Sequence, residues 1–180
     1  MAKRKRGSKV ALEKGELLKL LKVAREHSER DWLMILIGYL HGLRVSEICS
    51  MAVDDIRDGH ITVARLKGSL TTCQPLRTHS NPLLNEKAGL AAWMADRKKS
   101  EPLFGIGRFM FRLLFIDYCR EAGIPSHKQF PHVLKHSCAI HNIRDAGIEN
   151  VRQYLGHKSI ASTGSYLKVS DAEAAAAMKF

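Results

Sequence analysis

An apolar segment without a polar face is the feature that most constrains how this chain can fold. Residues 31–40 (DWLMILIGYL) are apolar nearly all the way round a helix, which is typical of a helix buried on every side. The wider apolar region, from Trp32 to Leu43, contains Gly38 and His41 and is too short to cross a bilayer. A chain of 180 residues can bury a real core without disulfide or metal staples, so we expect one domain around this helix.

The segments around the buried helix predict an α+β fold that is mostly helical, with a small antiparallel sheet. Apolar residues recur at helical spacing over 12–27, and a third helix is expected to begin near Val45. Residues 60–66 and 70–76 alternate and are rich in Thr, Val and Ile, which predicts a β-hairpin around Lys67-Gly68-Ser69 and one more short strand before it. Further helices are expected over 85–97, 106–121, 132–146, 149–155 and 170–178, with Gly123, Gly147 and Gly156 as C-terminal caps.

The charge of the chain favours a polyanionic partner. The formal net charge is +11, from 29 Lys and Arg against 18 Asp and Glu. An anionic membrane surface is a weaker candidate, because the basic residues do not lie opposite one apolar helical face. Residues 1–9 carry five Lys and Arg, which suits either a solubilising tail or an arm that contacts DNA phosphates.

The cysteines and the N-terminus indicate a cytoplasmic protein. Cys49, Cys73, Cys119 and Cys138 are scattered without a CxxC pair, a pattern that fits reduced thiols better than a disulfide framework or a zinc site. The basic N-terminus is not followed by the apolar core of a signal peptide.

Four short motifs occur in order along the chain: HGLRVSE at 41–47, RLKGS at 65–69, HVLKH at 132–136 and LGHKSIASTGSY at 155–166. Each is weak alone, but their order and spacing over about residues 12–170 resemble the tyrosine recombinase, or phage integrase, family. In that family an Arg stands in a Leu-Arg-x-Ser-Glu context and a Lys in a β-turn, followed by His-x-x-Arg and by a Leu-Gly-His nine residues before a nucleophilic Tyr. Short members such as the fimbrial recombinases consist of little more than this catalytic domain.

The resemblance implies a DNA recombinase or integrase that cuts and rejoins strands through a 3′-phosphotyrosyl intermediate. Tyr166 matches the nucleophile, and Lys67 matches the acid that protonates the departing 5′ oxygen. The remaining positions that match the catalytic set are Arg44, His132, Lys135 and His157. The family chemistry needs no metal or other cofactor.

Elementary chemistry agrees with this set of residue types. A phosphodiester gathers negative charge on its non-bridging oxygens in the transition state, and preorganised cations must stabilise that charge. Arg44 suits this task because a guanidinium can bind two phosphate oxygens at once. Ordinary structural roles stay open for each residue: an ion pair of Arg44 with Glu47, a solvated turn for Lys67, a helix-terminal His157 and an interfacial Tyr166.

One position departs from the family pattern. The family places an Arg where Lys135 stands, three residues after His132 on one helical face. A Lys keeps the charge but loses the bidentate fork, which puts full catalytic strength in doubt. A Lys135 that points to solvent would mark a chain that only binds DNA.

Two metal-binding interpretations are disfavoured by the sequence. The spacing of His132 and His136 invites a metal, but there is no HExxH motif and no third ligand nearby. The aspartates at 54, 55 and 58 are more typical of a solvated turn than of a two-metal nuclease.

The domain organisation expected from the resemblance is a basic tail over residues 1–11 and a catalytic domain over residues 12–180, without an N-terminal core-binding domain. Two explanations of that organisation stay open: a catalytic domain cut from a longer recombinase, or a short recombinase of the fimbrial type. The expected partners are double-stranded DNA, further copies of the chain in a tetramer on DNA, and accessory DNA-bending proteins; no membrane partner is expected. Two rival functions are a non-catalytic DNA-binding relative and a type IB topoisomerase-like nicking-closing enzyme. The intact Arg44, Lys67, His157 and Tyr166 argue against the first.

Overall fold

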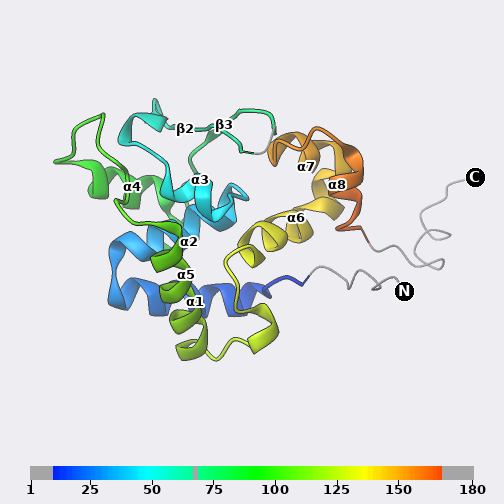
Figure 1. Ribbon diagram of the computed structural model, residues 1–180, viewed down its shortest axis with the longest axis horizontal. Coiled ribbons are helices and arrows are strands. Elements are labelled where there is room, and N and C mark those ends of the chain that lie inside the picture. The colour runs from blue at the N-terminus through cyan, green and yellow to red at the C-terminus, as the bar shows by residue number, and fades with distance from the viewer. Residues whose placement is uncertain (1–9, 67–68, 168–180) are drawn as a thin grey trace, which may run out of the picture.

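The computed structural model describes residues 10–66 and 69–167, and Figure 1 shows how their elements are arranged. The order of elements confirms the prediction of a mostly helical chain with a small antiparallel sheet. The predicted helix over 170–178 lies outside the described residues. The longer helices are α1 (Lys14–His27), α2 (Glu29–Leu40), α4 (Glu86–Met94), α5 (Arg108–Glu121) and α6 (Val133–Ala146). The short ones are α3 (Val45–Cys49), α7 (Ile148–Tyr154), α8 (Ile160–Gly164) and the 3₁₀ turns η1 (Val53–Asp55), η2 (Pro82–Leu84) and η3 (Ser126–Lys128).

Helix α2 is the centre of the main core, as its apolar sequence predicts. Every residue from Asp31 to Gly38 is buried, and α1, α4 and α6 all pack against this helix. The helix begins two residues earlier than predicted because the Ser28 hydroxyl accepts the Asp31 N–H at its N-terminus. None of the helices in the described ranges is long and apolar enough to pass through a bilayer.

The sheet has three antiparallel strands in the order β1 (Ile56–Arg57), β2 (His60–Val63) and β3 (Thr72–Pro75). The additional short strand and the hairpin are therefore confirmed, but β2 and β3 are shorter than predicted. Beyond the pair of Val63 with Thr72, the backbone groups turn to other partners. The N–H of Leu66 donates to Glu47 Oε1 (3.1 Å), and the N–H of Leu70 donates to the Gly156 carbonyl (3.0 Å). The ladder stops where side-chain and loop acceptors replace it.

Helices α6, α7 and α8 form one end of the molecule, shown from yellow to orange in Figure 1. A second, smaller core lies between them and contains Cys138, Ala139, Ile143, Val151, Leu155 and Tyr166. The sequence predicts α6 and α7 within two residues of their bounds but misses α8. Five residues are too few to show a helical period, and α8 is started by the Ser159 hydroxyl, which accepts the Ala161 N–H (3.3 Å).

Two histidines outside the predicted site, His41 and His141, have structural roles. The ring of His41 is fully buried and lies within hydrogen-bond distance of Gln74 Oε1 (2.6 Å) and Glu86 Oε2 (2.8 Å). His141 contacts the Tyr39 hydroxyl (3.0 Å) and the Leu12 carbonyl (2.8 Å). These contacts join α2 to β3 and α4, and α6 to the chain before α1.

Candidate active site

Arg44 lies where the chain leaves α2 and enters α3. Gly42, with φ of +59°, adopts the left-handed conformation that turns the chain there. The backbone N–H of Arg44 donates to Glu47 Oε2 (2.8 Å), and its Nη1 donates to Glu47 Oε1 (2.6 Å). The ion pair of Arg44 with Glu47, which the sequence left open as a structural role of Arg44, is therefore present. It orients the guanidinium without burying it, because 22% of the Arg44 side chain stays exposed.

Glu47 is a fully buried carboxylate that serves two arginines. Its Oε1 also accepts the Leu66 N–H, and its Oε2 lies 3.4 Å from Arg65 Nη1. Burial alone would raise the pKa of Glu47. Hydrogen bonds from Arg44 and Leu66, with the charge of Arg65, outweigh this effect and lower the pKa of the carboxyl below its usual value. Glu47 is therefore a stable anion that holds two cations in place.

Arg65 is the residue of this cluster to which the sequence assigns no role. Its guanidinium is fully buried and donates to the carbonyls of His41, Gly42 and Tyr154 as well as to Glu47. A signal for it exists in the strand pattern. Ile61 and Val63 face the core, so the inward position two residues further on belongs to Arg65. A charge on the buried face of a strand requires a buried partner.

Lys135 is also buried, which contradicts the interpretation that it points to solvent. The residue is 1% exposed on α6, and its Nζ donates to the Leu155 carbonyl (3.4 Å). Burial, followed by the charges of Arg65 and Arg44, lowers the pKa of Lys135 to about 7. Lys135 therefore belongs to the same electrostatic cluster as the two arginines.

His157 and Tyr166 lie on either side of α8 and are both nearly buried. Nδ1 of His157 lies 2.9 Å from the Thr163 hydroxyl, which ties the turn after α7 to α8. The ring of Tyr166 packs in the second core. Burial, followed by the negative charge that Cys138 carries as a thiolate, raises the pKa of Tyr166 to about 12, while the charge of Arg44 acts in the opposite direction. The phenol is therefore a neutral hydroxyl within the field of Arg44.

His132 stands at the N-terminal end of α6 and is exposed. Its ring meets the ring of His136 edge to face at 4.7 Å, and the ring of His136 meets that of Tyr166 in the same manner at 5.7 Å. A row of aromatic rings therefore connects the exposed end of α6 to Tyr166.

The metal-binding interpretations find no geometric basis in the described part of the chain. Among residues 10–66 and 69–167, no three His, Cys, Asp or Glu side chains are grouped so that they could hold a metal ion. Asp55 accepts the Ala52 N–H (2.9 Å), and Asp54 pairs with Arg57. Both aspartates stabilise the turn before β2.

Lys67 lies outside the described residues. The chain on either side of it is tied to Arg44. Nη1 of Arg44 lies 3.5 Å from the Leu66 carbonyl, and Nη2 lies 3.4 Å from the Ser69 hydroxyl. The RLKGS and HGLRVSE motifs, about twenty residues apart in sequence, therefore meet in the fold.

The described part of this cluster holds more positive than negative charge. Arg44, Arg65 and Lys135 all act on one another electrostatically, and Glu47 is the one carboxylate that acts on them there. Cations kept out of water at such close range repel one another. An anion placed beside Arg44 would relieve that repulsion, so the cluster suits a phosphate.

The structure explains why a glycine, Gly156, occupies the middle position of the Leu-Gly-His motif. Its φ is +67°, and a Cβ built on it would lie 2.6 Å from the Leu70 carbonyl oxygen and 3.0 Å from Arg65 Cγ. The absence of a side chain lets the turn before His157 touch the loop that follows Lys67.

Replacing Gly156 with Ala is expected to destabilise the protein more than the same change at Gly123. Gly123 has nearly the same φ, +68°, but open space around it. Gly123→Ala should cost about 1–2 kcal/mol from backbone strain alone. Gly156→Ala adds a clash with backbone, so a total of about 3 kcal/mol or more is expected in urea unfolding. Equal losses for the two variants would contradict the close approach of the two loops.

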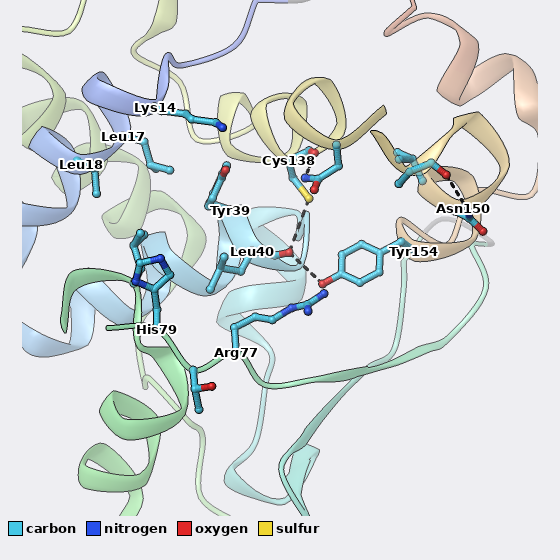
Figure 2. A pocket seen from close by; sticks show the side chains of 15 residues that line it. Lys14, Leu17, Leu18, Tyr39, Leu40, Arg77, His79, Cys138, Asn150 and Tyr154 are labelled. Carbon is cyan, nitrogen blue, oxygen red and sulfur yellow. Dashed lines mark hydrogen bonds between the residues drawn. The ribbon is translucent and has the colours of Figure 1, made fainter. Parts of the chain in front are cut away.

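A separate cavity of about 670 Å³ lies between α1, α2, α6, α7 and the segment after β3. Figure 2 shows Cys138 and Tyr154 directed toward the Leu40 carbonyl, with Arg77 beside them. None of the five predicted site residues within the described ranges lines this cavity. The candidate site is therefore the charged cluster and not the cavity.

Comparison with known proteins places the chain in a family. The sequence model of the Phage integrase family matches residues 11–173. Tyrosine recombinase XerA of Pyrococcus furiosus is 34% identical over 170 residues, which cover 89% of this chain and 57% of XerA. Type 1 fimbriae regulatory protein FimB of Escherichia coli K12 is 30% identical over 165 residues, which cover 84% of this chain and 80% of FimB.

A solved structure shares the fold. The crystal structure of the XerH site-specific recombinase bound to its difH substrate, a pre-cleavage complex, superposes with a TM-score of 0.76 at 21% identity. The superposition covers 99% of this chain and 56% of the XerH chain. The chain thus spans little more than half the length of XerA and XerH. The match over residues 11–173, with the identity to FimB along most of its length, shows that the chain belongs to the phage integrase family.

Proposed function

We propose that this chain is a site-specific DNA recombinase that cleaves and rejoins DNA through a 3′-phosphotyrosyl intermediate. The observation that carries the proposal is the cluster of Arg44, Arg65 and Lys135 around Glu47, beside a buried Tyr166 on which Arg44 acts. A phosphodiester supplies the anion that this cluster lacks, and its phosphorus is the atom that a phenol would attack.

In the proposed cleavage step, the Tyr166 hydroxyl oxygen attacks the phosphorus, its proton passes to a neutral imidazole of the site or to water, and the bond to the 5′ oxygen breaks. Arg44 binds the non-bridging oxygens through its exposed guanidinium edge, with Lys135, His132 and His157 as further donors. Lys67 donates the proton that turns the departing oxygen into a 5′-hydroxyl. The phosphotyrosyl bond stores the energy of the broken bond, so a 5′-hydroxyl can attack it and restore the DNA without ATP.

The proposed substrate is double-stranded DNA, and the proposed working assembly is a tetramer. XerH, which shares the fold, was crystallised bound to its difH substrate. Recombination of two duplexes requires four strand cuts, and each chain carries one Tyr at the nucleophile position, so four copies are needed. Accessory DNA-bending proteins and a cytoplasmic location complete the proposal.

The proposal is tested with nicked suicide substrates drawn from the DNA that flanks the gene. The nick lets the cleaved 5′ fragment diffuse away, so a covalent protein–DNA band accumulates on a denaturing gel. No covalent band on any such substrate would leave a DNA-binding relative. A band without recombinant products, accompanied by relaxation of supercoiled DNA, would indicate a nicking-closing enzyme.

Binding of the chain to DNA is expected to weaken steeply with salt. The net charge of +11 and contact with roughly six to ten phosphates imply a slope of about −5 to −9 in a plot of log affinity against log salt concentration. Fluorescence anisotropy with a labelled duplex at several salt concentrations measures the slope. A slope near zero would show that the basic excess does not contact DNA.

A further inference from the structure

We propose that Arg65 is a positioning residue of the strand-cleavage reaction: its buried guanidinium holds the Arg44 turn, the base of the hairpin and the end of α7 in one fixed arrangement. This inference rests on the recombinase function proposed above. It concerns a residue without any exposed guanidinium surface, which must act through the groups that it holds.

The hydrogen bonds of Arg65 use the whole guanidinium. A guanidinium has five N–H donors in a rigid plane. Nε donates to the Thr72 hydroxyl (3.1 Å), and Nη1 donates to the Gly42 carbonyl (3.1 Å) and to Glu47 Oε2 (3.4 Å). Nη2 donates to the carbonyls of His41 (3.0 Å) and Tyr154 (3.1 Å). Five donors therefore meet five acceptors on four separate segments.

Four of these five acceptors, all but the Thr72 hydroxyl, lie close to a predicted catalytic residue. The carbonyls of His41 and Gly42 belong to the turn directly before Arg44, and Glu47 holds the Arg44 guanidinium. The Tyr154 carbonyl ends α7, directly before the Leu155-Gly156-His157 turn. The Arg65 stem also lies against Gly156, where a Cβ would come within 3.0 Å of its Cγ. Arg65 thus fixes the distance between the Arg44 side of the site and the His157 side.

Stability alone does not account for this residue. A buried Arg–Glu pair costs so much desolvation that apolar residues of similar volume often stabilise a fold equally well or better. What apolar residues cannot do is fix the separation of three carbonyls and one carboxylate. A Lys cannot do so either, because its three donors diverge from one point while the Arg65 acceptors lie around a plane.

The charge of Arg65 offers a second readout. Lys135 experiences Arg65, Arg44, Glu47 and the Cys138 thiol, and after burial the charge of Arg65 is the largest cause that lowers the pKa of Lys135. Removing this charge raises the pKa of Lys135. If charged Lys135 supports cleavage, the pH at which cleavage by free protein is half lost moves upward. A loosening that lets water reach Lys135 would also raise its pKa, because burial is the first cause of the low value. Such a loosening would move the midpoint in both Arg65→Gln and Arg65→Lys, whereas loss of the charge moves it in Arg65→Gln alone.

The experiment compares Arg65→Gln and Arg65→Lys with the parent, using single-turnover cleavage of a nicked suicide substrate and DNA affinity by anisotropy. Arg57→Gln is the matched control, because Arg57 is an arginine of strand β1 with 64% of its side chain exposed. A misplacement of about 1 Å can cost 10²-fold in rate, so both Arg65 variants should cleave about 10²-fold more slowly. Their DNA dissociation constants should stay within about threefold, because Arg65 offers no exposed group to a phosphate. The pH at which cleavage is half lost should rise in Arg65→Gln and should be unchanged in Arg65→Lys.

Thr72→Val is the variant to test if circular dichroism shows that neither Arg65 variant folds. It removes one acceptor with little change of shape and should slow cleavage severalfold at unchanged DNA affinity. Cleavage at the parent rate by every folded variant would overturn the inference. A loss of cleavage rate matched by an equal loss of DNA affinity would also overturn it. So would an unchanged pH midpoint of cleavage in Arg65→Gln. A parent protein that forms no covalent band would instead overturn the proposed function.

Discussion

Tyr166→Phe is expected to abolish the covalent protein–DNA band while leaving DNA binding nearly unchanged. Phe retains the ring that packs with Leu155 and Cys138 in the second core, and it removes only the oxygen that would attack the phosphorus. The DNA dissociation constant should change by less than about tenfold, the worth of one neutral hydrogen bond. Denaturing gels after incubation with a suicide substrate measure the yield of the covalent band, and fluorescence anisotropy measures the DNA dissociation constant.

Tyr154→Phe is the control for this experiment. Tyr154 has a similarly buried hydroxyl with a raised pKa of about 12, and its hydroxyl donates to the Leu40 carbonyl (3.1 Å). This variant should still form the covalent band. A band of parental yield in Tyr166→Phe would remove Tyr166 as the nucleophile, whatever the control shows.

Lys135→Met is expected to lose about 10²–10³-fold in cleavage rate, the usual cost of removing one donor to a transition-state oxyanion. Met fills nearly the same volume without a charge, and a buried cation is costly to the fold. The free energy of unfolding should therefore stay the same or rise while the activity falls. Lys135→Ala should lose cleavage to a similar degree and lose stability as well, because it leaves a cavity.

The same variant tests the pKa of Lys135. In the unfolded chain this amine stays protonated up to about pH 10.5, whereas in the folded protein it releases its proton above about pH 7. The unfolded state binds more protons between these values, so this group makes the parent more stable as pH rises, by up to about 1.4 kcal/mol per pH unit. Denaturant unfolding of parent and Lys135→Met between pH 6 and 10 should show a difference in stability that shrinks as pH rises. Cleavage by the parent should decline as pH rises through about 7.

Two further variants complete the Lys135 test. Lys135→Arg should retain or raise the cleavage rate, because a fork supplies two parallel donors. Lys22→Met removes one positive charge from an exposed position on α1 and should cleave like the parent. Equal, measurable cleavage by the parent and Lys135→Met would remove Lys135 from the catalytic residues.

Local signals account for the parts of the fold that the sequence predicts well. The period of apolar residues predicts α1, α2, α5 and α6 within two residues of their bounds, since each helix is long enough to show its buried face. The prediction of element bounds is less accurate where an element is short or the backbone is irregular. The helix expected over 85–97 ends at Met94, where the chain turns and Arg97 stacks on the Trp93 ring.

In the candidate site, too, some features could be predicted from the sequence and others could not. Its motifs are recognisable because Arg44, His157 and Tyr166 stand in short local patterns. The burial of Lys135 and the role of Arg65 are not local properties. Lys135 could equally face solvent or the core when judged from its neighbours in α6, and only the approach of the α7 end supplies the Leu155 carbonyl.

The sequence by itself determined the family, the order of the longer helices and of the strands, and the six residues predicted to carry the chemistry, because short motifs and periodic patterns reside in consecutive residues. The tertiary structure alone decided which charges are buried and which segments share a partner. Arg65 bonds to acceptors 7, 18, 23, 24 and 89 residues away. Contacts over such separations exist only after the chain has folded, and burial then turns a basic pattern into a cluster of cations whose geometry and pKa values suit a phosphate.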